Sequence, residues 1–297
     1  MSNFAVFGNP IKHSKSPEIY ALFAKAIGVS DKYDLRLSSH QDFDEMIINF
    51  FDLGGLGANI TAPFKEQAYC LCDYLTERAI IANSVNTIKK QHDGTLLGDN
   101  TDGIGLISDL RYLHWLDKNS KIVATSRNVD IEKNSIEILN ILVCGAGGAA
   151  KGIIPVLLEL DTCYVNLVNR TPLNAQKLVR YYYSIGRQNI SYFDVNRLHF
   201  GLNKKYDLII NATGSSMVSE IPKIPSFLVT PETRCYDLFY QRQETSFITW
   251  CKSHGAVFCA DGLGMLVQQA AYSFYLWHNV FPNVVPVLNY FKSIYKL

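Results

Sequence analysis

Residues 138–160 read ILNILVCGAGGAAKGIIPVLLEL, and this stretch decides the fold. It predicts a buried strand at 140–144, a glycine-rich turn and then a helix, which is the setting of a dinucleotide-binding motif. Gly145 permits the tight turn, Gly147 lets backbone N–H groups approach a pyrophosphate, and Ala150 allows close packing of helix and strand. The pyrophosphate would bind at the helix N-terminus, where unpaired N–H groups and the helix dipole favour anions. The motif alone leaves open a tight turn that binds nothing.

The strand that follows the glycine turn narrows this choice. It ends in LVNRT, so that Asn169, Arg170 and Thr171 stand where an NAD site would carry an acidic residue. A guanidinium binds phosphate with two donors and stacks on adenine, and Thr171 adds a hydroxyl. The spacing favours NADP over NAD, and the alternative is a surface arginine at the end of a strand.

Strands and helices alternate around this motif, which predicts an α/β fold with a parallel sheet. We expect further strands at 164–171, 206–213, 233–240 and 256–262, and a helix at 172–185. The run at 265–280 is apolar around most of its circumference, so we expect a helix buried between two domains.

The first hundred residues also alternate strands with amphipathic helices. The expected elements are strands at 4–8, 56–61, 84–88 and 95–102 and helices at 16–28, 42–55 and 102–116. A polar stretch at 117–137 reads as an exposed insertion. We therefore expect two domains: 1–104, completed by 265–297, and a Rossmann-like domain at 105–264.

The composition excludes several classes of protein. The chain has 297 residues, 48% of them hydrophobic, and a net charge of +1, so no basic surface indicates nucleic acid or an anionic membrane. We see no signal peptide and no apolar run long enough to span a bilayer. The seven cysteines are scattered, which favours buried free thiols in a cytoplasmic protein. No cluster of His, Cys or carboxylate residues predicts a metal site.

Polar residues in three short motifs predict a catalytic site. HSKSP (13–17) supplies two hydroxyls, NITAPFKE (59–66) supplies an isolated lysine, and SVNT with GDNTD supply an amide and a carboxylate. Lys65 beside Asp102 would form an ion pair that moves a proton at a substrate hydroxyl or carbonyl. When a ketone accepts a hydride from a nicotinamide, negative charge develops on its oxygen, and a positioned ammonium stabilises that charge.

The neighbouring polar side chains suit a hydroxylated carboxylic acid. Ser14 and Ser16 could bind a carboxylate, while Asn59, Thr61 and Asn86 could bind ring hydroxyls. Some of the candidate residues also have a structural alternative. Ser16 and Asp102 could be helix N-caps, and Lys65 could be a solvated surface cation.

Taken together, these motifs make the chain closely similar to the bacterial shikimate dehydrogenases over nearly its whole length. The segments that carry the resemblance are VFGNPIKHSKSP, GANITAPFKE, SVNT, LLGDNTDGIGL, GAGGAAKG, VNRT, DLIINAT, CYDLFYQ and DGLGMLVQQAA. The family reduces 3-dehydroshikimate to shikimate with NADPH, in the pathway to aromatic amino acids. The resemblance implies a substrate domain, an NADP domain, and C-terminal helices that return to the first domain.

The resemblance also implies roles for single residues. Lys65 and Asp102 would be the catalytic pair, and the substrate would be bound by Ser14, Ser16, Asn59, Thr61, Asn86, Tyr240 and Gln269. The cofactor would be bound by Gly145, Ala146, Gly147, Gly148, Ala149, Asn169, Arg170, Thr171, Thr213, Leu238 and Gly262. From the residues alone, Tyr240 and Gln269 could equally be packing residues.

The chain departs from the family pattern at three places. Asn174 stands where many relatives carry a second arginine, which softens the expected preference for NADP, although Lys177 could assist Arg170. Gly214 replaces a frequent serine, and the stretch at 117–137 has no counterpart in shorter relatives.

Two other functions stay open at this point. One is a quinate/shikimate dehydrogenase that uses NAD, and the other is a non-catalytic sensor of NADP or shikimate. We expect a small-molecule substrate as the partner, and a monomer or a homodimer.

Overall fold

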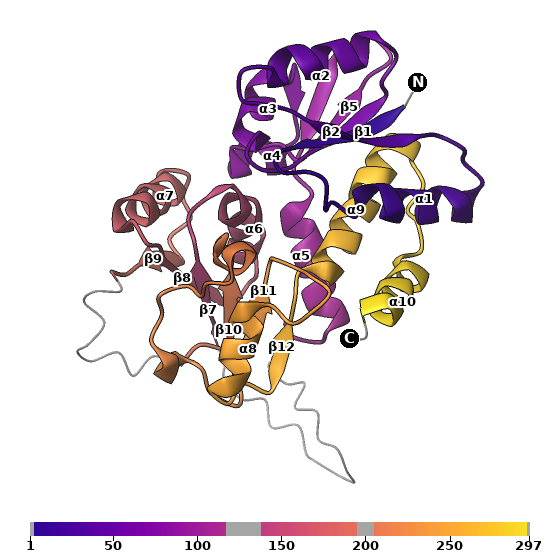
Figure 1. Cartoon of the computed structure of the whole chain (residues 1–297). Helices are drawn as coiled ribbons and strands as arrows, with labels where there is room; N and C mark the ends of the chain where they lie inside the picture. Colours follow the sequence, from indigo (N-terminus) through magenta and orange to yellow (C-terminus); the bar gives the residue numbers. More distant parts are fainter. Residues whose placement is uncertain (1–2, 117–137, 195–204, 296–297) are drawn as a thin grey trace.

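The computed structural model describes residues 3–116, 138–194 and 205–295. It contains two six-stranded sheets, each with its own layers of helices, and two helices that run side by side between them (Figure 1). These two are α5 (Asp102–Tyr112) and α9 (Leu263–His278), the second of which brings the C-terminal part of the chain back to the first sheet.

The first sheet has the strand order β2-β1-β3-β5-β6-β4. β1 pairs in parallel with β2 and β3, whereas β5 is antiparallel to both β3 and β6. The strands are β1 (Phe4–Gly8), β2 (Tyr33–Leu37), β3 (Gly57–Ile60), β4 (Tyr74–Leu75), β5 (Thr87–Lys90) and β6 (Leu96–Asp99). The helices of this part are α1 (Ser16–Ile27), α2 (Phe43–Asp52), α3 (Lys65–Leu71) and α4 (Glu77–Ala82).

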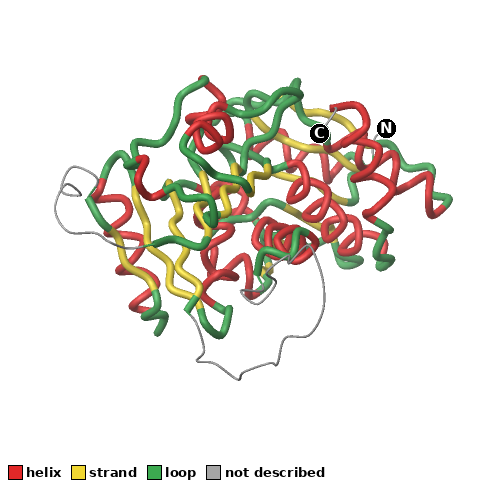
Figure 2. Tube along the Cα trace, turned by 90° about the horizontal axis from the view of Figure 1, so that it is seen from below, coloured by secondary structure: helices red, strands yellow, loops and turns green. Residues whose placement is uncertain are grey.

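The second sheet is entirely parallel, with the order β12-β11-β10-β7-β8-β9, and its strands lie side by side toward the left of Figure 2. Its strands are β7 (Leu139–Cys144), β8 (Cys163–Val168), β9 (Ile190–Tyr192), β10 (Leu208–Asn211), β11 (Arg234–Asp237) and β12 (Phe258–Ala260). The remaining elements are α6 (Gly148–Leu158), α7 (Pro172–Ser184), the 3-10 turns η2 (Ser215–Val218) and η3 (Ser226–Leu228), α8 (Ser246–Ser253) and α10 (Val284–Tyr295).

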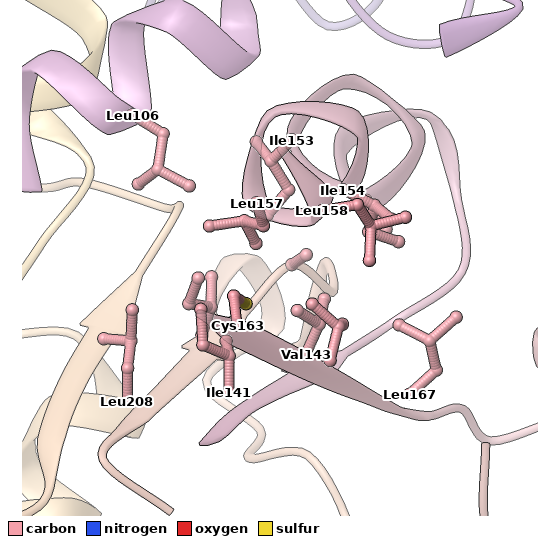
Figure 3. Packing of buried hydrophobic residues seen from close by; sticks show 14 of the residues in the cluster. Leu106, Ile141, Val143, Ile153, Ile154, Leu157, Leu158, Cys163, Leu167 and Leu208 are labelled. Atoms are coloured by element: carbon pink, nitrogen blue, oxygen red, sulfur yellow. The ribbon is translucent and has the colours of Figure 1, made fainter. Parts of the chain in front are cut away.

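The central strands of this sheet are buried on both faces. Ile141 and Val143 of β7 pack in one hydrophobic cluster with α6, where Ile153 and Leu157 lie over the strand (Figure 3). Leu142 belongs to the cluster on the opposite face, beside residues of α8. A strand covered on both sides needs a continuous apolar run, which is why the sequence here is apolar without alternation.

The structure confirms the expected α/β fold and the parallel sheet around the glycine turn. The strand pair around Asp93-Gly94 is present as β5 and β6. The helix expected at 102–116 ends earlier, at Tyr112, because the chain turns at His114 with a positive φ of 57°. The polar stretch expected at 117–137 lies outside the described residues.

Some expectations were incomplete or wrong. Cys70 is exposed and Cys72 and Cys259 are partly exposed, so the prediction of buried thiols holds only for the other four cysteines. The elements that the sequence analysis missed are β2, α3, β4, α4, β9, α8 and α10.

Candidate active site

A cavity of about 890 Å³ lies between the two sheets and is lined by residues from both sides. All nine predicted substrate and catalytic residues line it, although the motifs that carry them are far apart in the sequence. The predicted residues that line the cavity are Ser14, Ser16, Asn59, Thr61, Lys65, Asn86, Asp102, Ala149, Leu238, Tyr240, Gly262 and Gln269.

The Lys65 ammonium donates to a carboxylate oxygen of Asp102 in this cavity. Lys65 is the first residue of α3 and Asp102 the first residue of α5, so two helix starts hold the pair in place. The two side chains are 16% and 9% exposed, which rules out a solvated surface lysine. The N-cap of α5 is Thr101 and no side chain caps this helix, so Asp102 is not an N-cap either.

Asn86 holds the other oxygen of Asp102. Its amide nitrogen donates to Asp102 Oδ1 at 2.9 Å and lies 3.0 Å from Thr101 Oγ1, and its oxygen accepts from the Thr101 backbone at 2.8 Å. Gln269 of α9 contributes a side-chain oxygen 3.3 Å from the same amide nitrogen. Asp102 is therefore held by the ammonium on one oxygen and by a buried amide on the other.

The helix of the glycine turn comes very close to this carboxylate. A Cβ atom added at Gly152 of α6 would lie 2.8 Å from Asp102 Oδ2, and one added at Gly103 would lie 2.6 Å from the Gly152 carbonyl oxygen. Glycine at both positions therefore lets α5 and α6 approach closely. This contact brings the expected cofactor helix next to the catalytic pair.

The two serines lie together at the start of α1. The Ser14 hydroxyl donates to Ser16 Oγ at 3.2 Å, and no side chain caps the helix, so the N-cap alternative for Ser16 is wrong. Besides Lys65, three further cationic side chains line the same cavity: Lys12, Lys15 and Arg242. Two hydroxyls with cations nearby form a suitable site for a carboxylate.

Tyr240, which follows β11, and Gln269 of α9 also line the cavity. Burial raises the pKa of Tyr240 to about 12, so its hydroxyl stays protonated at neutral pH and can donate. Gln269 is 9% exposed, and its amide nitrogen donates to the Leu266 carbonyl at 3.0 Å while its oxygen faces Asn86 and Thr101. Both residues therefore line the cavity and also pack against neighbouring residues.

The glycine turn has the geometry that a pyrophosphate requires. Gly145 has a φ of 116°, a left-handed value that favours glycine, and its N–H donates to the Val168 carbonyl at 2.7 Å. Gly147 is the N-cap of α6 and no side chain caps the helix. Added Cβ atoms at Gly147 and Gly148 would meet nothing within 4 Å, so there is open space beside the start of α6. Uncapped N–H groups at a helix start can bind a phosphate.

The other predicted cofactor residues lie outside the residues that line the cavity. Asn169, Arg170 and Thr171 follow β8, and the Asn169 amide donates to the Thr171 carbonyl at 2.9 Å. Arg170 is exposed. The Thr213 hydroxyl donates to Asn211 Oδ1 at 2.6 Å. Those that do not line the cavity are Gly145, Ala146, Gly147, Gly148, Asn169, Arg170, Thr171 and Thr213.

Comparison with known proteins agrees with this geometry. Three family models match: the shikimate dehydrogenase substrate binding domain at residues 6–88, shikimate / quinate 5-dehydrogenase at 127–220, and the shikimate 5'-dehydrogenase C-terminal domain at 262–288. A shikimate dehydrogenase (NADP(+)) of Blochmanniella pennsylvanica (strain BPEN) is 59% identical over 298 residues, which cover 100% of both chains. The chain belongs to the shikimate dehydrogenase family. The corresponding protein of Blochmanniella floridana is 57% identical, with 99% of each chain covered.

Solved structures of shikimate dehydrogenase relatives share the fold. The Ael1 enzyme from Pseudomonas putida is 31% identical, with a TM-score of 0.81 and 98% of both chains covered. The shikimate 5-dehydrogenase of Thermus thermophilus in complex with NADP(H) and shikimate is 25% identical, with a TM-score of 0.79, and the match covers 99% of this chain and 100% of that one. The predicted family and fold class are thereby confirmed.

Three polar residues next to this site were not predicted from the sequence motifs. Thr87, Thr101 and Ser273 form a buried hydroxyl cluster behind it, with the Thr87 and Ser273 oxygens 2.8 Å apart. Ser273 follows Gln269 by one helical turn on α9, a spacing that could have indicated a shared face. The pairing of that face with β5 could not be read from the sequence, because it depends on how α9 packs.

Two other kinds of site are absent from the described residues. No group of three or more His, Cys, Asp or Glu residues that could hold a metal lies among them. None of the helices within these ranges has the length and apolarity needed to cross a membrane.

Proposed function

We propose that this member of the shikimate dehydrogenase family catalyses the reversible reduction of 3-dehydroshikimate to shikimate with NADPH. The observation that carries the proposal is the Lys65–Asp102 ion pair in a cavity that Ala149, in the first turn of α6, also lines. The predicted activity, enzyme class and cofactor agree with the names of the curated relatives.

The chain's own residues divide the work between binding and proton transfer. Ser14 and Ser16 bind the substrate carboxylate, and the side chains of Asn59, Thr61 and Asn86 face the ring hydroxyls. Lys65 donates a proton to the carbonyl oxygen as negative charge develops there, and in the reverse direction it accepts that proton. Asp102, held by Asn86, keeps the ammonium aimed at this oxygen.

The residues of the glycine turn fit NADP. The first N–H groups of α6 would bind the pyrophosphate, and Arg170 with Thr171 would bind the 2′-phosphate. When bound, the cofactor supplies the hydride to the substrate carbon. Leu238 and Gly262, which line the cavity on the side of the second sheet, would bound the nicotinamide pocket.

The test is a cofactor-dependent assay on the purified protein. We expect oxidation of NADPH when 3-dehydroshikimate is supplied, and a larger kcat/KM with NADPH than with NADH. A larger kcat/KM with NADH, together with turnover of quinate, would favour the NAD-dependent alternative. Binding of shikimate and NADP by calorimetry without any turnover would indicate a sensor. The cytoplasmic location, the division into domains, and the choice between monomer and homodimer stay predictions.

A further inference from the structure

The side-chain amide of Asn59 is held from two opposite sides. Its oxygen accepts a hydrogen bond from the Tyr33 hydroxyl at 2.7 Å. Its nitrogen lies 3.0 Å from Ser273 Oγ, 3.1 Å from Thr87 Oγ1 and 3.2 Å from the Asn86 carbonyl oxygen. A flipped amide would place its oxygen against that carbonyl, which can only accept, so a single orientation satisfies these groups.

This orientation determines what Asn59 offers to a ligand. The two amide hydrogens face three acceptors inside the protein, whereas the oxygen has two lone pairs and Tyr33 uses one of them. Asn59 lines the cavity, so the second lone pair is what it has left for a substrate. It therefore meets a ring hydroxyl as an acceptor.

Tyr33 is itself firmly held on β2. Its ring lies 4.9 Å from the ring of Tyr20 and 6.3 Å from that of Trp277, centroid to centroid. Burial raises the pKa of Tyr33 well above its usual value, and an interaction with the Ser16 hydroxyl opposes this rise in pKa. The tyrosine therefore stays protonated and can donate to Asn59.

We propose that Tyr33 is a positioning residue for the substrate, whose hydroxyl fixes Asn59 as a hydrogen-bond acceptor. This inference rests on the proposed function, because it assigns Asn59 and Ser16 to a hydroxylated ring acid. Tyr33 acts through Asn59 and takes no part in proton transfer. Its loss should weaken substrate binding and leave the chemical step nearly unchanged.

The substitution Tyr33→Phe tests this, since it removes one hydroxyl and keeps the ring. We expect KM for 3-dehydroshikimate to rise roughly three- to tenfold, as for one lost neutral hydrogen bond, while kcat stays within about twofold. The Kd of shikimate, measured by calorimetry, should rise by the same factor. The matched control is Tyr20→Phe, because the Tyr20 hydroxyl faces His278 Nε2 at 2.9 Å and not Asn59. This control should leave KM unchanged.

A double-mutant cycle separates positioning from a general loss of structure. In an Asn59→Ala background, Tyr33→Phe should cause no further rise in KM or Kd. An unchanged KM in Tyr33→Phe, or an equal rise in the Asn59→Ala background, would overturn the inference. Absence of both turnover and shikimate binding in the unaltered protein would instead refute the proposed function, and the inference with it.

Discussion

Lys65 lies in an environment that differs from that of an ordinary surface lysine. It is 16% exposed and paired with Asp102, and it faces a cavity that also contains hydroxyl and amide groups. An ammonium in this setting can protonate a developing alkoxide. Its chemical role can therefore be tested apart from substrate binding.

We predict that Lys65→Ala lowers kcat by roughly 10²- to 10⁴-fold, the usual effect of losing a positioned proton donor. KM should change far less, because the carboxylate and hydroxyl contacts remain. Steady-state kinetics gives both constants, and circular dichroism checks the fold. Lys252→Ala is the matched control, since Lys252 is an exposed lysine paired with Glu244 and should be dispensable. A kcat for Lys65→Ala equal to that of the unaltered protein would show that the role is assigned wrongly.

Several residues of the site were predictable because their chemistry is explicit in short motifs. An isolated lysine, a carboxylate at a helix start and paired serines can be recognised without a structure. Tyr33 and Ser273 were not predicted, because their roles depend on contacts between β2, β3 and α9 that no local pattern encodes. Their hydroxyls become informative only when the amide between them is seen.

At the scale of elements, the strands beside the glycine turn were predictable because burial on both faces leaves an unmistakable apolar run. α10 was missed although Val287, Leu288, Phe291 and Tyr295 have helical spacing and are buried. β2 was missed although YDLRL alternates, since Leu35 and Leu37 are exposed and the strand lies at a sheet edge. Because β2 is only partly buried, its sequence lacks the continuous apolar run that marks strands buried on both faces.

A buried carboxylate joins three elements. Asp109 of α5 is 3% exposed and accepts from the Tyr236 hydroxyl of β11 at 2.6 Å, and that hydroxyl accepts from the Met265 N–H of α9. Burial raises the pKa of Asp109 to about 6 from 3.8, and the hydrogen bond from Tyr236 opposes this rise in pKa. Between pH 3.8 and about pH 6, Asp109 is therefore protonated in the folded protein and ionised in the unfolded chain.

This pKa predicts how stability depends on pH. The stabilisation from the retained proton is complete below about pH 4 and is lost as the pH rises through 6. Asp109→Asn should remove this loss, which amounts to up to roughly 3 kcal/mol in the free energy of unfolding. Chemical denaturation at pH 4 and pH 7 measures most of it. Burial also raises the pKa of Asp261 to about 6, so part of the dependence should persist in the variant.

A second substitution should extend the pH dependence of stability instead of removing it. Tyr236→Phe removes the hydrogen bond that lowers the pKa of Asp109, so the loss of stability should extend to higher pH. Identical dependence of unfolding on pH in Asp109→Asn and the unaltered protein would contradict the assignment to Asp109.

At the scale of the whole molecule, the two sheets contribute different halves of the site. Helices of the second sheet also contact helices of the first. Lys151 of α6 pairs with Glu66 of α3 at 2.5 Å, and the Tyr181 hydroxyl of α7 donates to the Ile81 carbonyl of α4 at 3.2 Å. The ion pair is partly exposed, so its contribution to stability is small. Contacts of this kind would not prevent the two halves from moving relative to each other.

We predict that the two halves move toward each other and close the cavity when both ligands bind, with hinges near 102–106 and 262–265. Closure would exclude water from the Lys65–Asp102 pair. Small-angle scattering should show a smaller radius of gyration with NADP and shikimate together than without ligands, and each ligand alone serves as the control. Equal scattering curves in the unliganded and doubly liganded protein would argue against hinge motion.

The return of α9 to the first sheet has a consequence for synthesis on the ribosome. Gln269 and Ser273 complete a polar layer whose other members are made within the first 102 residues. The first 102 residues must therefore leave the ribosome long before α9 is synthesised, since more than half of the chain is translated in between. A nascent polypeptide halted before α9 would hold Asn59 and Asn86 without these partners, so the substrate half matures only after the cofactor half has been produced.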